Sequence, residues 1–337
     1  MASTALAGYW ELWLTPTISL SFVIESERSA PSLLRLVSRF ALYFQPSLTR
    51  QSLEYELESR GAGTEGISAA TLRVVDAAYY RSLQAQGISS SSTPIYPEEL
   101  VVSIAATEGI PSDAETYKLL EASLERVLAT YSLVDEVVER TETPFVDGNE
   151  ASEAQLRELF KLLKPEQELS GLVSKQWQEI GFQGTSPKTD FRRLGSLALD
   201  SILFFARTYG HRAAEVVDEA VNGGLHWYPL ALAMIHMTAF ALDMATSRDL
   251  QLLLLRSFQA PPEQRGDSSK PDTTPVLAVA SELLLLFHAH WLRGGYTVMQ
   301  FEQVSKEFQE ALRPWVRRGV LDGRALGWDT GDHLKIE

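Results

Sequence analysis

The sequence contains no cysteine, and this absence excludes several kinds of site at once. Disulfides, thiolate zinc sites and cysteine nucleophiles all require that side chain. Histidine offers no substitute, because no His-Glu-x-x-His spacing occurs, and His288 and His290, two residues apart, fall on different faces of a helix. We therefore predict no metal site and expect each histidine to be structural or an exposed polar residue.

Nucleotide-binding and hydrolase motifs are also missing or misplaced. The sequence has no P-loop and no Gly-x-Ser-x-Gly element. One Gly-x-Gly-x-x-Gly occurs at residues 61–66, but it follows a charged, helix-like stretch at 51–60. A dinucleotide site needs that pattern directly after a strand, inside a βαβ unit. We interpret residues 61–66 as a flexible loop between helices.

Positive charge is scarce, since 30 Lys and Arg face 44 Asp and Glu, for a net charge of −14. An acidic surface repels phosphate backbones and anionic headgroups, so we expect no nucleic-acid partner and no polybasic membrane binding. No Lys or Arg precedes the apolar N-terminal stretch, as a signal peptide would require. The apolar stretch after Pro229 is about 13 residues long, short of the roughly 20 of a membrane span. We interpret it as a buried core helix and expect no transmembrane segment.

Helical periodicity dominates the rest of the chain. Apolar residues recur at three- and four-residue steps, which is typical of helices with one buried face. The only run with β character is Ile18–Ile24. We therefore predict an all-α protein of several helices. Helices are expected over residues 31–44, 68–83, 115–140 (after a capping box at Ser112 and Glu115), 152–164, 191–208, 211–222, 229–256, 276–292 and 298–318.

Composition also suggests how the chain is divided. Residues 89–97 are rich in Ser and Pro and form the best candidate linker. We predict an additional helical N-terminal segment of unknown role at 1–90, a main domain at 98–320 and a C-terminal tail at 321–337.

The most informative stretch lies between residues 174 and 195. Two glycines three apart, Gly181 and Gly184, predict a tight turn with a positive φ at one or both. Pro187 then stiffens the approach to the helix expected at 191–208.

Thr189 or Asp190 is suited to cap the N-terminus of that helix. Arg192 and Arg193 would then lie in its first turn, where positive charge opposes the helix dipole. One interpretation is structural, with Arg192 paired to Asp190, Asp200 or another buried carboxylate. The other is that Arg192 is kept for a function outside the chain. The residues alone leave both open.

The same stretch resembles the signature of the ELMO domain, Trp-x-x-(Ile/Leu)-Gly-Phe-Gln-Gly-x-x-Pro-x-Thr-Asp-Phe-Arg-Gly-x-Gly, which here runs from Trp177 to Gly195. Residues 228–238, 287–291 and 301–308 are similar to later helices of that domain. The resemblance covers roughly residues 115–318 and places the chain with the ELMO-domain-containing proteins. It implies a multi-helix orthogonal bundle for the main domain.

The resemblance also implies a GTPase-activating protein for small GTPases of the Arf and Arl families. The Arg that follows Asp-Phe is the proposed catalytic residue of that group and corresponds to Arg192. GTP and Mg would be bound by the partner GTPase, so no cofactor is expected on this chain. We expect a cytoplasmic protein, recruited at most peripherally to endomembranes through its partner. The residues expected to support Arg192 are Trp177, Gly181, Phe182, Gln183, Gly184, Pro187, Thr189, Asp190 and Phe191.

Departures from the family pattern keep other functions open, and one of them is Ser186, which stands before Pro187 where the family often has an acidic residue. Arg193 replaces a Gly, and we expect it either to obstruct docking or to make a second phosphate contact. Met234 and His236 replace a Gly and an Asn in a later helix; Met234 suits a gap in the core, and His236 retains one amide-like hydrogen bond. The alternatives are a non-catalytic ELMO-type scaffold that binds a small GTPase or an exchange factor, and a helical protein that has lost both roles.

Overall fold

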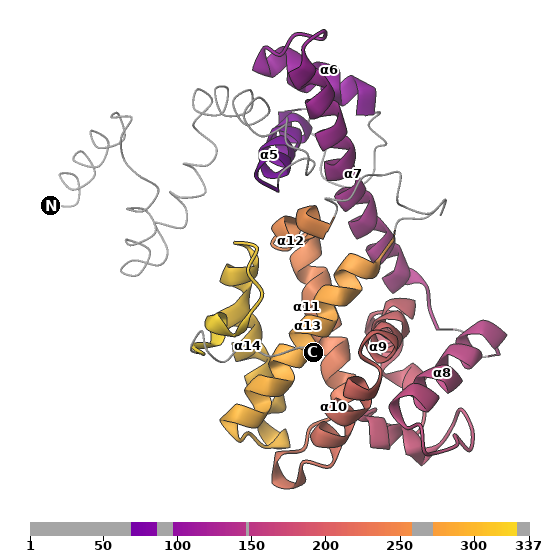
Figure 1. The fold of residues 1–337 in the computed structure, drawn as a ribbon. Helices are drawn as coiled ribbons and strands as arrows, with labels where there is room; N and C mark the ends of the chain where they lie inside the picture. Colours follow the sequence, from indigo (N-terminus) through magenta and orange to yellow (C-terminus); the bar gives the residue numbers. More distant parts are fainter. Residues whose placement is uncertain (1–68, 86–96, 146–147, 258–271, 329–337) are drawn as a thin grey trace, which may run out of the picture. The chain divides into compact units, whose positions relative to one another are not determined.

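The computed structural model describes residues 69–85, 97–145, 148–257 and 272–328 (Figure 1). Helices make up all regular structure in these ranges, which confirms the all-α prediction. The helix expected at 31–44, the run Ile18–Ile24, the loop at 61–66 and most of the 89–97 linker lie outside the described residues. The α-helices are α5 (Ala69–Ala85), α6 (Pro97–Glu108), α7 (Glu115–Glu142), α8 (Glu150–Leu163), α9 (Ser196–Tyr209), α10 (His211–Val221), α11 (Leu230–Thr246), α12 (Gln251–Ser257), α13 (Thr274–Gly294) and α14 (Phe301–Val316).

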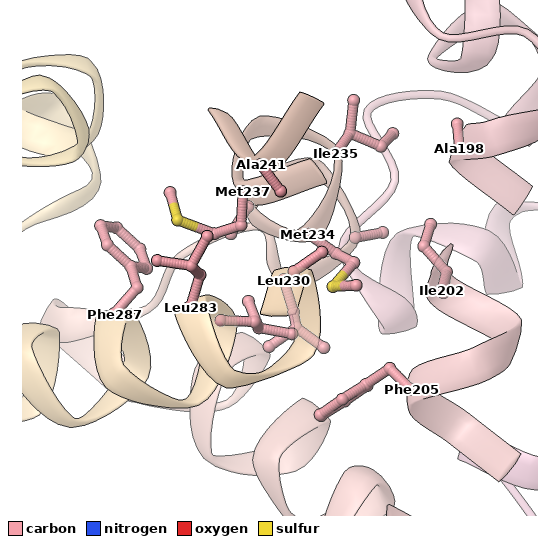
Figure 2. Packing of buried hydrophobic residues seen from close by; sticks show 14 of the residues in the cluster. Ala198, Ile202, Phe205, Leu230, Met234, Ile235, Met237, Ala241, Leu283 and Phe287 are labelled. Carbon is pink, nitrogen blue, oxygen red and sulfur yellow. The ribbon is translucent and has the colours of Figure 1, made fainter. Parts of the chain in front are cut away.

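The core forms where α9, α11 and α13 pack against one another. Figure 2 shows Ile202 of α9, Met234 of α11 and Leu283 of α13 among the side chains of this cluster. The residues of α11 are predominantly apolar around its whole circumference, as expected for a helix that is surrounded by other helices. The prediction that the apolar stretch after Pro229 is a buried core helix is therefore confirmed, and Met234 is buried within it.

Two helices pass a length and composition test for a membrane span, Gly224–Thr246 and Thr274–Gly294. In the fold, 61% of the most apolar stretch of the first helix and 67% of that of the second are buried inside the structure. Core helices of soluble proteins pass the same test, so these two helices do not establish a transmembrane segment.

Several helix boundaries differ from the sequence expectation. The helix expected at 229–256 is interrupted between α11 and α12, where Arg248 has a φ of 65°. The helix expected at 298–318 begins with a short 3-10 helix, η6 (Val298–Gln300), capped by Thr297. The capping box at Ser112 does not form, because α7 begins at Glu115 after Ala114 and has no side-chain cap. Helix α6 was not expected.

Helix α5 belongs to the stretch predicted as a separate N-terminal segment, yet it contacts α6, α7 and α12. Asp76 of α5 is buried and accepts hydrogen bonds from Tyr131 of α7 (3.1 Å) and Gln251 of α12 (3.0 Å). Its carboxylate also pairs with Arg248. Burial raises the pKa of Asp76, and Arg248 opposes that shift. These contacts attach α5 to the helices that carry the rest of the fold.

Candidate functional site

The Arg192 loop, which we define as residues 164–195 between α8 and α9, is built from three short 3-10 helices. They are η1 (Lys175–Ile180), η2 (Pro187–Thr189) and η3 (Phe191–Arg193). The expectation of an α-helix from residue 191 is wrong, since α9 begins at Ser196 after Gly195, whose φ is 54°. Arg192 and Arg193 therefore lie on η3, a separate turn before the α-helix, and the argument from the helix dipole does not apply to them.

Of the two glycines in the predicted turn, only Gly181 has a positive φ, at 93°. A Cβ at this position would lie 2.8 Å from the carbonyl carbon of Pro229 and would also collide with the backbone nitrogen of Leu230. The nearest atom to a Cβ on Gly184 would be 3.8 Å away. The turn at Gly181 is thus pressed against the start of α11, and no side chain fits between them.

Asp190 closes the loop, but not by capping a helix as expected. Its carboxylate accepts a hydrogen bond from the backbone N–H of Gln183 at 2.9 Å, and its side chain makes no capping bond to η3. The hydroxyl of Thr189 donates to the carbonyl of Ser186 at 3.0 Å, so Thr189 is not a cap for α9 either. Pro187 is buried at the start of η2. The cap prediction fails because the carboxylate reaches across the loop.

Aromatic side chains form the base of the loop. Phe182 contacts both Trp177 and Phe191 edge-on, with ring centroids 5.7 and 5.8 Å apart. All three are buried, and Trp177 also contacts Phe160 of α8. The indole N–H of Trp177 donates to the carbonyl of Leu172 at 3.0 Å, so its polar group is satisfied. The residue immediately before Arg192 is therefore fixed in the core.

A second anchor follows Arg192 and was not among the predicted site residues. A Cβ on Gly195 would lie 2.5 Å from the carbonyl oxygen of Thr141 and 2.9 Å from that of Arg140, at the end of α7. The backbone N–H of Ser196 donates to the carbonyl of Thr143 at 2.8 Å, and the hydroxyl of Ser196 donates to the backbone carbonyl of Arg140 at 3.0 Å. The last Gly of the motif, which is Gly195 here, was the available signal for this contact.

Arg192 itself is exposed, and no hydrogen bond or ion pair joins it to the residues that the structure describes. The carboxylates suggested as its partners are engaged elsewhere. Asp190 is bonded to Gln183, and Asp200 pairs with Arg140 at 3.1 Å. The structural interpretation of Arg192 as half of an ion pair with either carboxylate is therefore wrong.

Arg193 is also exposed and lies near His236 of α11 and Glu302 of α14. Burial lowers the pKa of His236, Glu302 opposes the shift and Arg193 adds to it. The ring of His236 contacts Phe301, with centroids 5.4 Å apart. The amide-like hydrogen bond expected of His236 is not formed with any described residue. Two departures from the family pattern, Arg193 and His236, thus lie near each other.

Potential metal ligands do not gather within the described ranges, where no group of three or more His, Asp or Glu is placed to hold an ion. His288 is buried and bonds to the hydroxyl of Tyr228 (2.9 Å) and to Glu219 (2.7 Å). His211 is exposed and pairs with Glu215. Their surroundings are those of structural and surface residues.

Comparison with known protein families identifies the family of this chain. The sequence model of the ELMO/CED-12 family matches residues 135–305, slightly more than half of the 337-residue chain. The chain belongs to the ELMO/CED-12 family. The match includes the whole Arg192 loop and the core helices α9, α11 and α13, whereas α5 and α6 precede it.

Curated relatives carry ELMO-domain names. Mouse ELMO domain-containing protein 1 is 28% identical over 210 residues, covering 57% of this chain and 62% of the relative. Mouse ELMO domain-containing protein 2 is 36% identical over 111 residues, 33% of this chain and 38% of the relative. Dictyostelium discoideum ELMO domain-containing protein B is 28% identical over 194 residues, 57% and 63% of the two chains. The chain spans at most about three fifths of these relatives, and no solved structure matches it.

Proposed function

We propose that this ELMO-family chain is a GTPase-activating protein for small GTPases of the Arf and Arl families, with Arg192 as the arginine finger. The observation that supports the proposal is the exposed guanidinium of Arg192, which has no partner among the described residues and lies on a loop that is otherwise fixed. Among the described residues, neither a carboxylate nor a backbone carbonyl accepts a hydrogen bond from this guanidinium. Arg192 is instead available to a second molecule.

The chemistry of GTP hydrolysis explains why such a residue is effective. Negative charge spreads over the transferred phosphoryl oxygens and the leaving oxygen in the transition state. A planar guanidinium supplies bidentate hydrogen bonds to those oxygens and stays charged at any working pH. Fingers supplied in this way accelerate hydrolysis by about 10³–10⁵-fold. In this proposal GTP and Mg belong to the GTPase, and this chain contributes no cofactor.

The loop has the properties that a finger requires of its support. Gly181 is held against α11, Gly195 is held against α7, and Phe191 is buried between them. The backbone at Arg192 is therefore constrained on both sides while its side chain points to the surface. Preorganisation of this kind reduces the entropy lost when the finger reaches its target.

The site of action follows from the proposed partner. The net charge of −14 disfavours direct attachment to an anionic membrane. We propose that the protein acts in the cytoplasm and reaches endomembranes only when its GTPase is bound there.

The test is the rate of GTP hydrolysis by a panel of Arf and Arl GTPases, with the wild-type chain, Arg192→Lys and Arg73→Lys. Arg73 is an exposed arginine on α5 and serves as the matched control. We expect the wild type and Arg73→Lys to stimulate a member of the panel. Arg192→Lys keeps the charge but loses the planar fork, so we expect stimulation to fall by about 10³-fold or more with an unchanged melting temperature.

Two results would contradict the proposal. One is an unchanged rate across the panel with the wild-type chain. The other is full stimulation by Arg192→Lys. If no GTPase is stimulated and the chain retains an exchange factor in a pull-down, the non-catalytic scaffold function is supported instead.

A further inference from the structure

Gln183 lies in the Arg192 loop beside the segment that carries Arg192. Its backbone N–H donates to the carboxylate of Asp190, two positions before Arg192, at 2.9 Å. The residue before Gln183 is Phe182 and the residue before Arg192 is Phe191, and these two rings are in contact, with centroids 5.8 Å apart. The two short segments that contain these residues therefore lie side by side.

Gln183 and Arg192 are both exposed at this junction. Each of them directly follows one ring of the contacting pair, and both rings are buried in the core. The hydrogen bond between Gln183 and Asp190 keeps the two backbone segments together. The loop thus presents an exposed amide and an exposed guanidinium from adjoining segments of one fixed support.

The side-chain amide of Gln183 is not used within the loop. It makes no hydrogen bond to any described residue, although the backbone N–H and carbonyl of Gln183 both do. The other three glutamines of the Arg192 loop each donate a side-chain N–H to an acceptor within the loop; they are Gln167, Gln176 and Gln178. The structural contacts of Gln183 are therefore made by its backbone, and they do not require its amide.

GTP hydrolysis requires an oriented water molecule as well as a cation. The oxygen of the water forms a bond to the γ-phosphorus, the bond to the oxygen that bridges to the β-phosphate breaks, and GDP leaves with that electron pair. One proton of the water passes to a phosphoryl oxygen, so the products are GDP and inorganic phosphate. The attacking and leaving oxygens lie roughly in line, and a glutamine orients the water in small GTPases.

An amide is suited to orienting this water. Its oxygen accepts a hydrogen bond from the water, while its N–H group donates to a phosphoryl oxygen. The attacking and leaving oxygens are on opposite sides of the γ-phosphorus, so one side chain does not serve both. Two side chains from adjoining segments of a rigid loop meet this requirement.

We propose that Gln183 is a second catalytic residue supplied in trans, whose amide orients the attacking water while Arg192 stabilises the charge on the leaving oxygen. This inference rests on the proposed function of Arg192 as the finger. Asp190 is the positioning residue that holds the two segments together. Gln183 is unchanged by the reaction, since it neither gains nor loses a proton.

The first test compares the wild-type chain with Gln183→Ala, Gln183→Glu and Thr185→Ala on a GTPase of the Arf and Arl panel that the wild type stimulates. Thr185 is exposed on the same loop, and its hydroxyl has no partner among the described residues, so it is the matched control. We expect Gln183→Ala to lower the stimulated kcat by about 10²-fold, with the KM for the GTPase and the melting temperature unchanged.

The Gln183→Glu variant tests the chemistry of the amide. Glutamate has nearly the shape of glutamine, but it loses the N–H donor and brings a negative charge to the phosphoryl oxygens. We expect its kcat to fall at least as far as that of Gln183→Ala. Thr185→Ala should match the wild type.

The second test uses the same GTPase with its own water-orienting glutamine replaced by leucine. We expect the wild-type chain and Thr185→Ala to stimulate this GTPase, and Gln183→Ala to leave its rate unchanged. A residue with a merely structural role in the loop would not replace a glutamine that is missing from the partner, so this result would identify Gln183 as the source of the amide.

The outcomes separate this inference from the proposed function. If the wild-type chain stimulates the original GTPase but not the leucine variant, the GTPase orients its own water and the role of Gln183 is wrong. Equal stimulation by Gln183→Ala and the wild type, or a raised KM at unchanged kcat, would also overturn that role and leave Arg192 as the finger. If the wild-type chain stimulates no GTPase of the panel, both proposals are wrong.

Discussion

At the scale of single residues, Asp190 shows how one side chain fixes the loop that presents Arg192. Its carboxylate is the acceptor for the N–H of Gln183, seven positions earlier in the chain. Hydrogen bonds to a charged group contribute about 1.5–3 kcal/mol when buried, and less when partly exposed as here.

We therefore expect Asp190→Ala to lower the free energy of unfolding by roughly 1 kcal/mol. It should also reduce stimulated GTP hydrolysis, because the backbone before Arg192 loses its tie to the rest of the loop. Asp190→Asn retains an acceptor oxygen and should have a smaller effect on both. Denaturant unfolding and hydrolysis rates check the prediction, and an Ala variant as stable and as active as the wild type would show that this bond does not position the finger.

The motif was enough to select Arg192 as the proposed finger, whereas the sequence could not predict that Arg192 has no partner among the described residues. Asp190 and Asp200 are both close to Arg192 in sequence and were plausible partners. Which carboxylate engages which donor depends on contacts between distant segments, such as the pair between Arg140 of α7 and Asp200 of α9. Such contacts have no signal in local spacing.

At the scale of secondary structure elements, the two glycines of the loop have different roles. Gly181 combines a φ of 93° with backbone atoms at the start of α11 where a Cβ would be, whereas a Cβ on Gly184 would make only ordinary van der Waals contacts, the nearest at 3.8 Å. A positive φ alone costs a non-glycine residue about 1–2 kcal/mol. The collision with α11 adds to that cost, because backbone atoms cannot move aside as a flexible side chain can.

We expect Gly181→Ala to destabilise the protein by roughly 2 kcal/mol or more, and Gly184→Ala to change stability by less than about 0.5 kcal/mol. The pair is a matched comparison, since both changes add one methyl group to the same loop. Thermal and denaturant unfolding give the answer. Equal effects of the two substitutions would mean that the turn is not pressed against α11 as described.

The sequence predicted most helices, but it did not predict the short 3-10 helices of the Arg192 loop or the start of α9 at Ser196. Periodic apolar residues identified α9, α10 and α13 within a few residues of their observed bounds. The same signal extended α9 back to Phe191, because Phe191 and Leu194 are buried like residues of a helix. Gly195 ends the 3-10 turn through its contact with α7, and that contact joins segments far apart in the chain. Similarly, Arg248 separates α11 from α12 while it pairs with Asp76 of α5.

At the scale of the whole molecule, buried histidines link stability to pH. Burial lowers the pKa of His288, and the hydrogen bond that its ring donates to the carboxylate of Glu219 opposes that shift. Burial also lowers the pKa of His236 and of His290. The folded state therefore binds fewer protons than the unfolded state just below the ordinary histidine pKa of about 6.5.

Because unfolding then takes up protons, the contribution of these histidines to the free energy of unfolding should be complete above about pH 6.5. The free energy of unfolding should decrease as the pH falls below that value. Unfolding titrations between about pH 5.5 and pH 7.5 measure the slope. His288→Gln should give a shallower slope than the wild type. A stability that is independent of pH in this window would contradict the burial of neutral histidines.

The fold leaves the guanidinium of Arg192 exposed on a loop that is anchored on both sides, and the central claim is that this guanidinium enters another protein's nucleotide site. Aluminium fluoride with GDP mimics the phosphoryl group in transfer, and a finger binds such a mimic better than the ground state.

The most direct measurement is complex formation between this chain and a GDP-loaded Arf or Arl GTPase, with and without aluminium fluoride. We expect the wild type to form a stable complex only when aluminium fluoride is present, and Arg192→Lys to form none under the same conditions. A complex that ignores aluminium fluoride, or that Arg192→Lys forms as well as the wild type, would contradict the account.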